Sequence, residues 1–148
     1  KVINMTENEM VNICYNIFEE NNKYKNIIRE VPFLSRSIDM VLITLDDEII
    51  SIEFKLKDWK QAIKQAVDHK NGSDKAYICM PKPPMGFKDD FLNELNEKGI
   101  GLLEFLPDSR ESIREIITAK ENKNRWIPNI ISLKDIVNRV SNKEIFAV

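Results

Sequence analysis

Hydrophobic residues recur along the chain with two different periods. Segments in which they return every three or four positions are predicted as helices, because that spacing lines one helix face. The predicted helices are residues 7–21, 58–70, 88–98 and, nearer the end of the chain, about 109–121 and 132–141. Segments rich in β-branched and other large apolar residues, bounded by polar turns, are predicted as strands. The predicted strands are residues 26–34, 38–45, 49–56, 74–80 and 100–106.

The order of these elements indicates the fold class. An α-β-β-β-α-β-α-β sequence predicts an α/β fold with a mixed central sheet flanked by helices. Pro32 lies in the first predicted strand and is typical of a sheet edge or a bend. The 148 residues suit a single domain. We expect its core at about residues 6–106 and a C-terminal helical extension at about residues 107–148.

Composition narrows the functional classes. No apolar run approaches the ~18 residues of a membrane span, and the first residues lack the order of a signal peptide, so we expect a cytoplasmic protein without a membrane partner. Cys14 and Cys79 lie in apolar patterns typical of buried free thiols, which fits a reducing compartment. The net charge of -2 argues against a surface coated with basic residues, although it is compatible with a local basic groove.

The second and third predicted strands form a hairpin whose register can be tested against its hydrophobic pattern. A two-residue loop would mix apolar and polar residues on both faces of the hairpin. A loop at residues 45–47 separates them and puts Asp39 opposite Glu53, whereas a loop at residues 46–48 keeps the same faces and puts Asp39 opposite Lys55. Either longer loop therefore assembles these three side chains. The apolar pairs expected for the loop at 45–47 are Ile38 with Phe54, Met40 with Ile52 and Leu42 with Ile50.

The paired carboxylates of Asp39 and Glu53 indicate a cation site. Two adjacent carboxylates repel each other, and a divalent cation relieves that repulsion. Carboxylate oxygens, together with a main-chain carbonyl near Phe54 and water, suit Mg²⁺ or Mn²⁺. Such an ion lowers the pKa of a bound water and stabilises charge on a phosphate oxygen. Lys55 would then orient the attacking water or neutralise the phosphate.

These residues resemble a known motif. Asp39, a spacer of 13 residues and the run Glu53-Phe54-Lys55 are similar to the D…E-x-K motif of the PD-(D/E)xK phosphodiesterases, the restriction-endonuclease-like nucleases. The resemblance covers roughly residues 6–80 and includes the following helix with Trp59 and its glutamines. The sequence departs from the family pattern in lacking a proline before Asp39, and its last third matches no family known to us.

The resemblance implies further site residues. A glutamate of the first helix should complete the metal site, and Glu9 is favoured by its distance to the helix end. The alternatives are Glu7, Glu19, Glu20 and Glu30. A glutamine of the helix after E-x-K often takes part in the family, and Gln65 is preferred to Gln61. Contacts with nucleic acid are expected from Arg36, Lys57, Lys60, Gln61 and Lys64.

Simpler interpretations exist for several of these residues. Asp39, Glu53 and Lys55 fit a solvated hairpin face with a cross-strand salt bridge worth about 0.5 kcal/mol. A capping box with Thr6 already explains Glu9. His69, near a predicted helix end, is interpreted as a partner of the helix dipole rather than as a ligand or base.

The sequence as a whole predicts a metal-dependent nuclease that hydrolyses phosphodiester bonds in DNA. The expected cofactor is Mg²⁺ or Mn²⁺, the expected partner is nucleic acid, and the chain is expected to act as a homodimer or as part of a larger chain. The main alternative is a non-catalytic module that binds nucleic acid or protein on the same fold. A third interpretation, an interaction protein with merely solvated charges, would follow if Asp39 and Glu53 lay on opposite sheet faces.

Overall fold

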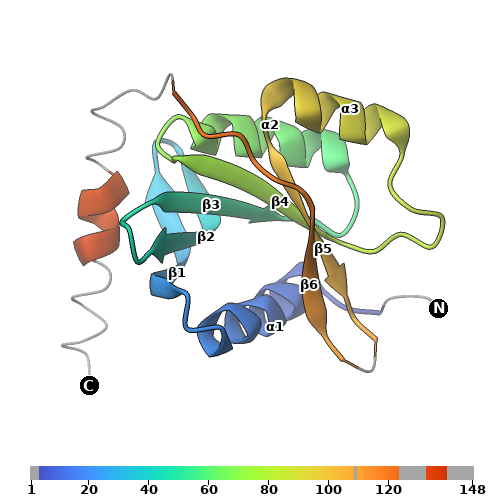
Figure 1. The fold of residues 1–148 in the computed structure, drawn as a ribbon, viewed down its shortest axis with the longest axis horizontal. Coiled ribbons are helices and arrows are strands. Elements are labelled where there is room, and N and C mark those ends of the chain that lie inside the picture. The colour runs from blue at the N-terminus through green and yellow to red at the C-terminus, as the bar shows by residue number, and fades with distance from the viewer. Residues whose placement is uncertain (1–3, 109, 124–132, 140–148) are drawn as a thin grey trace.

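The computed structural model describes residues 4–108, 110–123 and 133–139, shown in Figure 1. The labelled helices are α1 (Glu7–Glu20), α2 (Trp59–Lys70) and α3 (Asp89–Lys98). The strands are β1 (Tyr24–Phe33), β2 (Arg36–Thr44), β3 (Ile49–Phe54), β4 (Lys75–Pro81), β5 (Gly101–Leu106) and β6 (Ser112–Ile117). Residues 133–139 are also helical. The α/β class predicted from the sequence is confirmed.

One mixed sheet contains all six strands in the order β1-β2-β3-β4-β5-β6. The strands β1, β2 and β3 are antiparallel, β3, β4 and β5 are parallel, and β6 returns antiparallel to β5. The helices α2 and α3 make the two connections that parallel pairing requires. Figure 1 shows α1 on one face of the sheet and α2 with α3 on the other. The edge position of β1, which carries Pro32, agrees with the prediction.

The hydrophobic core consists of three clusters, one on the α1 face of the sheet and two on the opposite face. Side chains of α1 such as Met10 and Phe18 pack against Leu42 and Ile52. On the opposite face, α2 and α3 bury residues including Ile63 against Ile78 and Leu102 of the parallel strands. The free thiols of Cys14 and Cys79 are buried on the α1 side, as predicted.

The predicted helix near residues 109–121 is wrong, because residues 112–117 form β6. Pairing with β5 overrides the local pattern there. Arg114 donates to the buried Glu104 of β5 at 2.7 Å, and the Tyr77 hydroxyl donates to Glu115 at 2.5 Å. The C-terminal extension therefore begins with a strand.

The helix predicted at 132–141 is present over residues 133–139, and its remaining positions lie outside the described residues. Its Leu133 and Val137 pack with Ile28 and Ile43 on the sheet face opposite α1. Within the part of the chain that the structure describes, every helix is too short or too polar to cross a membrane.

Candidate active site

The register of the β2–β3 hairpin corresponds to a loop at residues 45–47, one of the two loops that the sequence left open. Met40 pairs with Ile52 and Leu42 pairs with Ile50. Asp47 closes the turn by donating its N–H to the Thr44 carbonyl at 2.9 Å. Asp39 follows the last of these pairs and lies beside Glu53, which is one of the two placements that the sequence left open.

The regular pairing of β2 with β3 ends at Met40. Both β1 and β2 are irregular at the next residue along each strand. Arg29 pairs with Met40 and Val31 with Ile38, which leaves Glu30 and Asp39 between two paired levels. Glu30 has a φ of 52°, a left-handed conformation that is uncommon for a residue with a side chain. At this level, the alternation of side chains between the two faces of the sheet is interrupted in both strands.

The predicted pair of Ile38 with Phe54 is wrong for the same reason. Ile38 packs with Val31 and Phe33 on the face opposite α1, whereas Phe54 packs on the α1 face. Asp39 lies at this irregular level and therefore does not follow the alternation of side chains along β2. Its carboxylate occupies the space beyond the last β2–β3 pair.

The Asp39 carboxylate is held close to Glu53. Its Oδ2 accepts the Phe54 N–H at 2.8 Å, and the Asp39 N–H lies 3.5 Å from Glu53 Oε1. Burial raises the pKa of Asp39 to about 7, and the charge of Glu53, a hydrogen bond with Glu53 and the charge of Glu7 add to this rise, while the Phe54 N–H opposes it. The two carboxylates therefore repel each other as expected, and an unprotonated Asp39 near neutral pH calls for a counter-charge.

Glu53 extends from β3 beneath α2 and is only 3% exposed. His69, in the last turn of α2 and 2% exposed, places Nδ1 2.9 Å from Glu53 Oε1. Neither ring nitrogen makes an aligned hydrogen bond to any described residue, so the contact is close but poorly directed. The interpretation of His69 as a partner of the helix dipole missed this contact, because a sequence shows helix position but not burial against a particular strand.

Glu7 is the helix glutamate that reaches this site. A cavity of about 230 Å³ is lined by Glu7, Asn8, Val11, Arg29, Glu30, Asp39 and Phe54. Glu7 Oε2 also accepts the N–H of Leu56, just after the E-x-K segment, at 3.2 Å. Glu7 and Val11 are four residues apart and so share one helix face.

The preference for Glu9 is not supported by its placement. Glu9 is exposed, lies outside the cavity lining and completes a capping box in which Thr6 N–H donates to Glu9 Oε1 at 3.3 Å. The capping box is visible in the sequence and argues against Glu9 as the helix glutamate of the metal site. A carboxylate that turns back to the N-cap points away from the strands. Among the alternatives, Glu30 also lines the cavity, whereas Glu19 and Glu20 are exposed at the other end of α1.

Arg29 is a site residue that the sequence did not indicate. Its guanidinium donates to Asn8 Oδ1 at 2.9 Å and to Asn12 Oδ1, both on α1. Both partners are neutral amides, so neither cancels the positive charge that Arg29 brings to a cavity also lined by Glu7, Glu30 and Asp39. The arrangement offers a cation for an anionic substrate group beside the carboxylates.

The remaining residues predicted for the site differ in how deeply their side chains are buried. Lys55 is half-buried and donates its backbone N–H to the Cys79 carbonyl at 3.1 Å. Gln65 is half-buried, and its buried Oε1 has no hydrogen-bond partner among the described residues. Arg36 is exposed and lies 4.0 Å from Asp68. Lys57 is exposed two residues before α2, and Lys60, Gln61 and Lys64 are exposed on that helix.

A divalent cation suits the chemistry of this site, although the ligands are not preassembled. No group of three or more His, Cys, Asp and Glu side chains among the described residues is already gathered around one point. The pKa of Asp39 and its contact with Glu53 nevertheless indicate a pair of hard oxygen donors with unbalanced negative charge. The Phe54 carbonyl and Glu7 supply further oxygen atoms nearby.

We expect His69→Leu to lower the free energy of unfolding by about 1 to 2 kcal/mol, because it removes the polar group closest to the buried Glu53 carboxylate and leaves only the longer contact with the Asp39 N–H. His69→Asn keeps an N–H donor near the position of Nδ1 and should lose less. Urea unfolding at pH 7 measures both variants. Equal losses would show that the imidazole contributes only through packing.

Comparisons with known proteins give the fold but not a family. No family model matches the sequence, and no curated protein matches it. A protein of unknown function from Silicibacter pomeroyi, SPO1766, superimposes with a TM-score of 0.65 at 15% identity, over 98% of this chain and 92% of that chain. A repair endonuclease from Pyrococcus abyssi superimposes with a TM-score of 0.50 at 17% identity, over 72% of this chain and 50% of that chain. EndoMS, in an EndoMS–dsDNA2 complex, gives a TM-score of 0.50 at 17% identity, over 74% of this chain and 49% of that chain.

The chain shares its fold with endonucleases. This likeness agrees with the restriction-endonuclease-like architecture expected from the sequence. The chain spans about half the length of those two endonuclease chains but nearly the whole length of SPO1766. The likeness concerns the backbone alone, so the activity has to be argued from the residues of the site.

Proposed function

We propose that the protein is a metal-dependent nuclease that hydrolyses phosphodiester bonds in DNA. The observation that carries the proposal is the carboxylate pair of Asp39 and Glu53, in which burial and mutual repulsion raise the pKa of Asp39 to about 7. A pair in this state, next to a cavity and on a fold shared with endonucleases, is suited to hold a divalent ion against a phosphate.

Asp39, Glu53 and the Phe54 carbonyl would hold Mg²⁺ or Mn²⁺, and Glu7 would complete the set in place of Glu9. When bound, such an ion lowers the pKa of a coordinated water and stabilises negative charge on a phosphate oxygen. Lys55, which follows directly on the same strand segment, would neutralise the phosphate or orient the attacking water. Arg29 would attract the phosphate from the cavity side, where the oxygens to which its guanidinium donates are those of the neutral amides Asn8 and Asn12.

DNA is proposed as the substrate for two reasons. The neighbours with this fold include a repair endonuclease and a protein in complex with double-stranded DNA. The exposed cations Lys60 and Lys64 lie on the helix that follows the E-x-K segment, and Lys57 lies just before it, where they would contact a phosphate backbone that crosses the site.

The test is cleavage of labelled linear duplex, single-stranded and branched DNA with Mn²⁺, Mg²⁺ or EDTA. The wild-type protein is compared with Glu53→Gln and Lys55→Ala. Cutting that requires metal and is lost in both variants is the expected result. Cutting that survives both substitutions, or that proceeds in EDTA, would contradict the proposal.

A second candidate is a non-catalytic module that binds nucleic acid on this fold. The observation that favours it is the lack of a preassembled group of three acidic or other metal-ligating side chains among the described residues. Such a module would bind DNA with similar affinity in wild-type and Glu53→Gln forms and cut none of the substrates with either metal. The same set of reactions, run beside a binding assay, separates the two candidates.

A further inference from the structure

The connection between β4 and α3, residues 82–88, carries an unusual apolar side chain. Figure 1 shows this connection extending away from the body of the molecule. Met85 is 96% exposed, more than the other exposed large apolar residues, such as Leu45 at 68%. The Met85 side chain is therefore almost entirely accessible to a partner.

The segment that presents Met85 is stiff. The Gly86 N–H donates to the Pro83 carbonyl at 3.1 Å, which closes a β-turn with Pro84 and Met85 at its tip. Pro83 and Pro84 have restricted φ angles, and Gly86 supplies the positive φ of 78° that the turn requires. A rigid turn loses little conformational entropy when its tip is buried against a partner.

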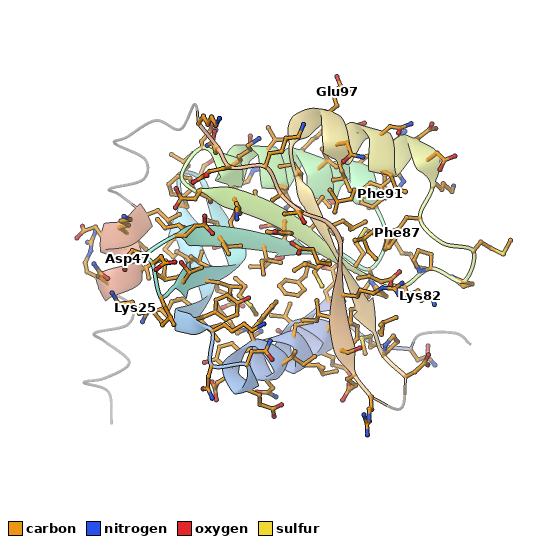
Figure 2. All side chains as sticks on the ribbon, in the orientation of Figure 1. Lys25, Asp47, Lys82, Phe87, Phe91 and Glu97 are labelled. Atoms are coloured by element: carbon orange, nitrogen blue, oxygen red, sulfur yellow. The ribbon has the colours of Figure 1, made fainter. Side chains whose placement is uncertain are left out.

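Both ends of the segment are anchored to the protein. The Lys82 N–H donates to the Phe105 carbonyl at 2.9 Å, and the Phe87 ring lies 5.9 Å from the ring of Phe91. Figure 2 shows Lys82, Phe87 and Phe91 on the same side of the molecule. The ring of Trp59, at the start of α2, packs on Phe91 at 5.1 Å. The turn is therefore supported by the same aromatic cluster as the start of α2.

The turn leaves the sheet at the edge where the candidate active site lies. Phe54 pairs with Cys79 of β4, and the strand ends at Pro81, only two residues further on. The parallel strands β3 and β4 end at this edge, so Glu53 and the turn extend from the same side of the sheet.

Charge around the turn favours a polyanion. Lys82 and Lys88 are exposed and flank the turn, and residues 82–88 contain no acidic side chain. Lys57 is exposed just before α2, and the exposed Lys60 places its ammonium 5.7 Å from the Trp59 ring of the shared aromatic cluster. The nearest acidic residues along the chain, Asp89 and Asp90, lie in the first turn of α3, where the helix dipole offsets their charge.

We propose that this turn is a DNA-contacting wedge, in which Met85 enters the minor groove and unstacks a base step while Lys82 and Lys88 contact the flanking phosphates. Apolar side chains of this kind enter base steps in many minor-groove binders, with cations on either side. The proposal rests on the proposed function, because it assumes that the substrate is duplex DNA.

Duplex binding is measured by fluorescence anisotropy with the full chain and a labelled DNA that carries 2-aminopurine, in EDTA and in Ca²⁺ so that cleavage is suppressed. We expect Met85→Ala to weaken binding about tenfold and to abolish the rise in 2-aminopurine fluorescence that reports unstacking. Met85→Leu keeps an apolar wedge and should retain both signals. Lys82→Gln and Lys88→Gln should each weaken binding and reduce its salt dependence. Leu45→Ala, an exposed apolar residue at the other end of β3, is the matched control and should change neither signal.

The outcomes separate this proposal from the nuclease proposal. Duplex binding with a Met85-dependent fluorescence rise, but without metal-dependent cutting, would support the wedge and contradict the nuclease. Metal-dependent cutting with the Met85→Ala variant indistinguishable from wild type in affinity and fluorescence would overturn the wedge alone. Failure of the wild-type protein to bind duplex DNA would also overturn the wedge, and the turn would then be assigned to a protein partner.

Discussion

Replacing Glu7 by Gln is expected to lower the rate of metal-dependent DNA cleavage about 100-fold, equivalent to about 2.7 kcal/mol of transition-state stabilisation. Glu7 lines the cavity with Asp39, and its charge contributes to the raised pKa of that residue. A glutamine retains the size of the side chain and an oxygen that accepts the Leu56 N–H. The substitution therefore removes the negative charge that a divalent ion needs while leaving the local hydrogen bond in place.

Glu9→Gln is the matched control for this prediction. Glu9 lies on the same helix, two positions away, and its carboxylate is used in the capping box with Thr6. Glutamine also functions at that position of a capping box, so the variant should retain activity within about twofold. Initial rates on a labelled duplex at saturating Mn²⁺ measure both. A greater loss in Glu9→Gln than in Glu7→Gln would contradict the assignment of the site from the cavity.

Replacing Asp39 by Asn is expected to stabilise the metal-free protein by about 2 to 4 kcal/mol at pH 8 and to have little effect at pH 4. The pKa of Asp39 rises from 3.8 to about 7 in the fold. Between these pH values the folded protein holds a proton that the unfolded chain has released, so the stability of the wild type falls as the pH rises. Asparagine carries no charge, still accepts the Phe54 N–H and removes the repulsion with Glu53.

Urea unfolding in EDTA across pH 4 to pH 8 measures this effect for both proteins. The wild-type curve should fall through the window between the two pKa values, and the difference from Asp39→Asn should be complete above about pH 7. Adding Mn²⁺ at pH 8 should stabilise the wild type more than the variant, because a bound cation relieves the same repulsion. Parallel curves for the two proteins at every pH would show that Asp39 is not destabilised by its surroundings.

The hairpin register was predictable because it depends on local alternation. The alternation excludes the two-residue loop and leaves the loops at 45–47 and 46–48, and the structure uses the first of these. The irregular level at Asp39 was not predictable in the same way. It depends on Glu30 of the neighbouring strand, whose positive φ leaves no sequence signal of the kind that glycine provides.

Two other features depended on tertiary context. Residues 112–117 are charged and carry spaced isoleucines, a pattern compatible with either a helix or a strand, and the free edge of β5 decides between them. The contact of His69 with Glu53 depends on how α2 packs across β3, which no spacing within the helix reveals. The choice of helix glutamate was closer to prediction, since the capping box shows which carboxylate is already used.

The strands lie side by side in the sheet in the order in which the chain is synthesised, from β1 to β6. Each strand pairs with its predecessor, so no strand has to wait for a distant segment before it joins the sheet. Proteins whose contacts are close in sequence fold faster than those that need long loops to close. We therefore expect the nascent chain to add β1, β2 and β3 before it completes β4, with Glu53 becoming buried only once α2 has emerged and packed over it.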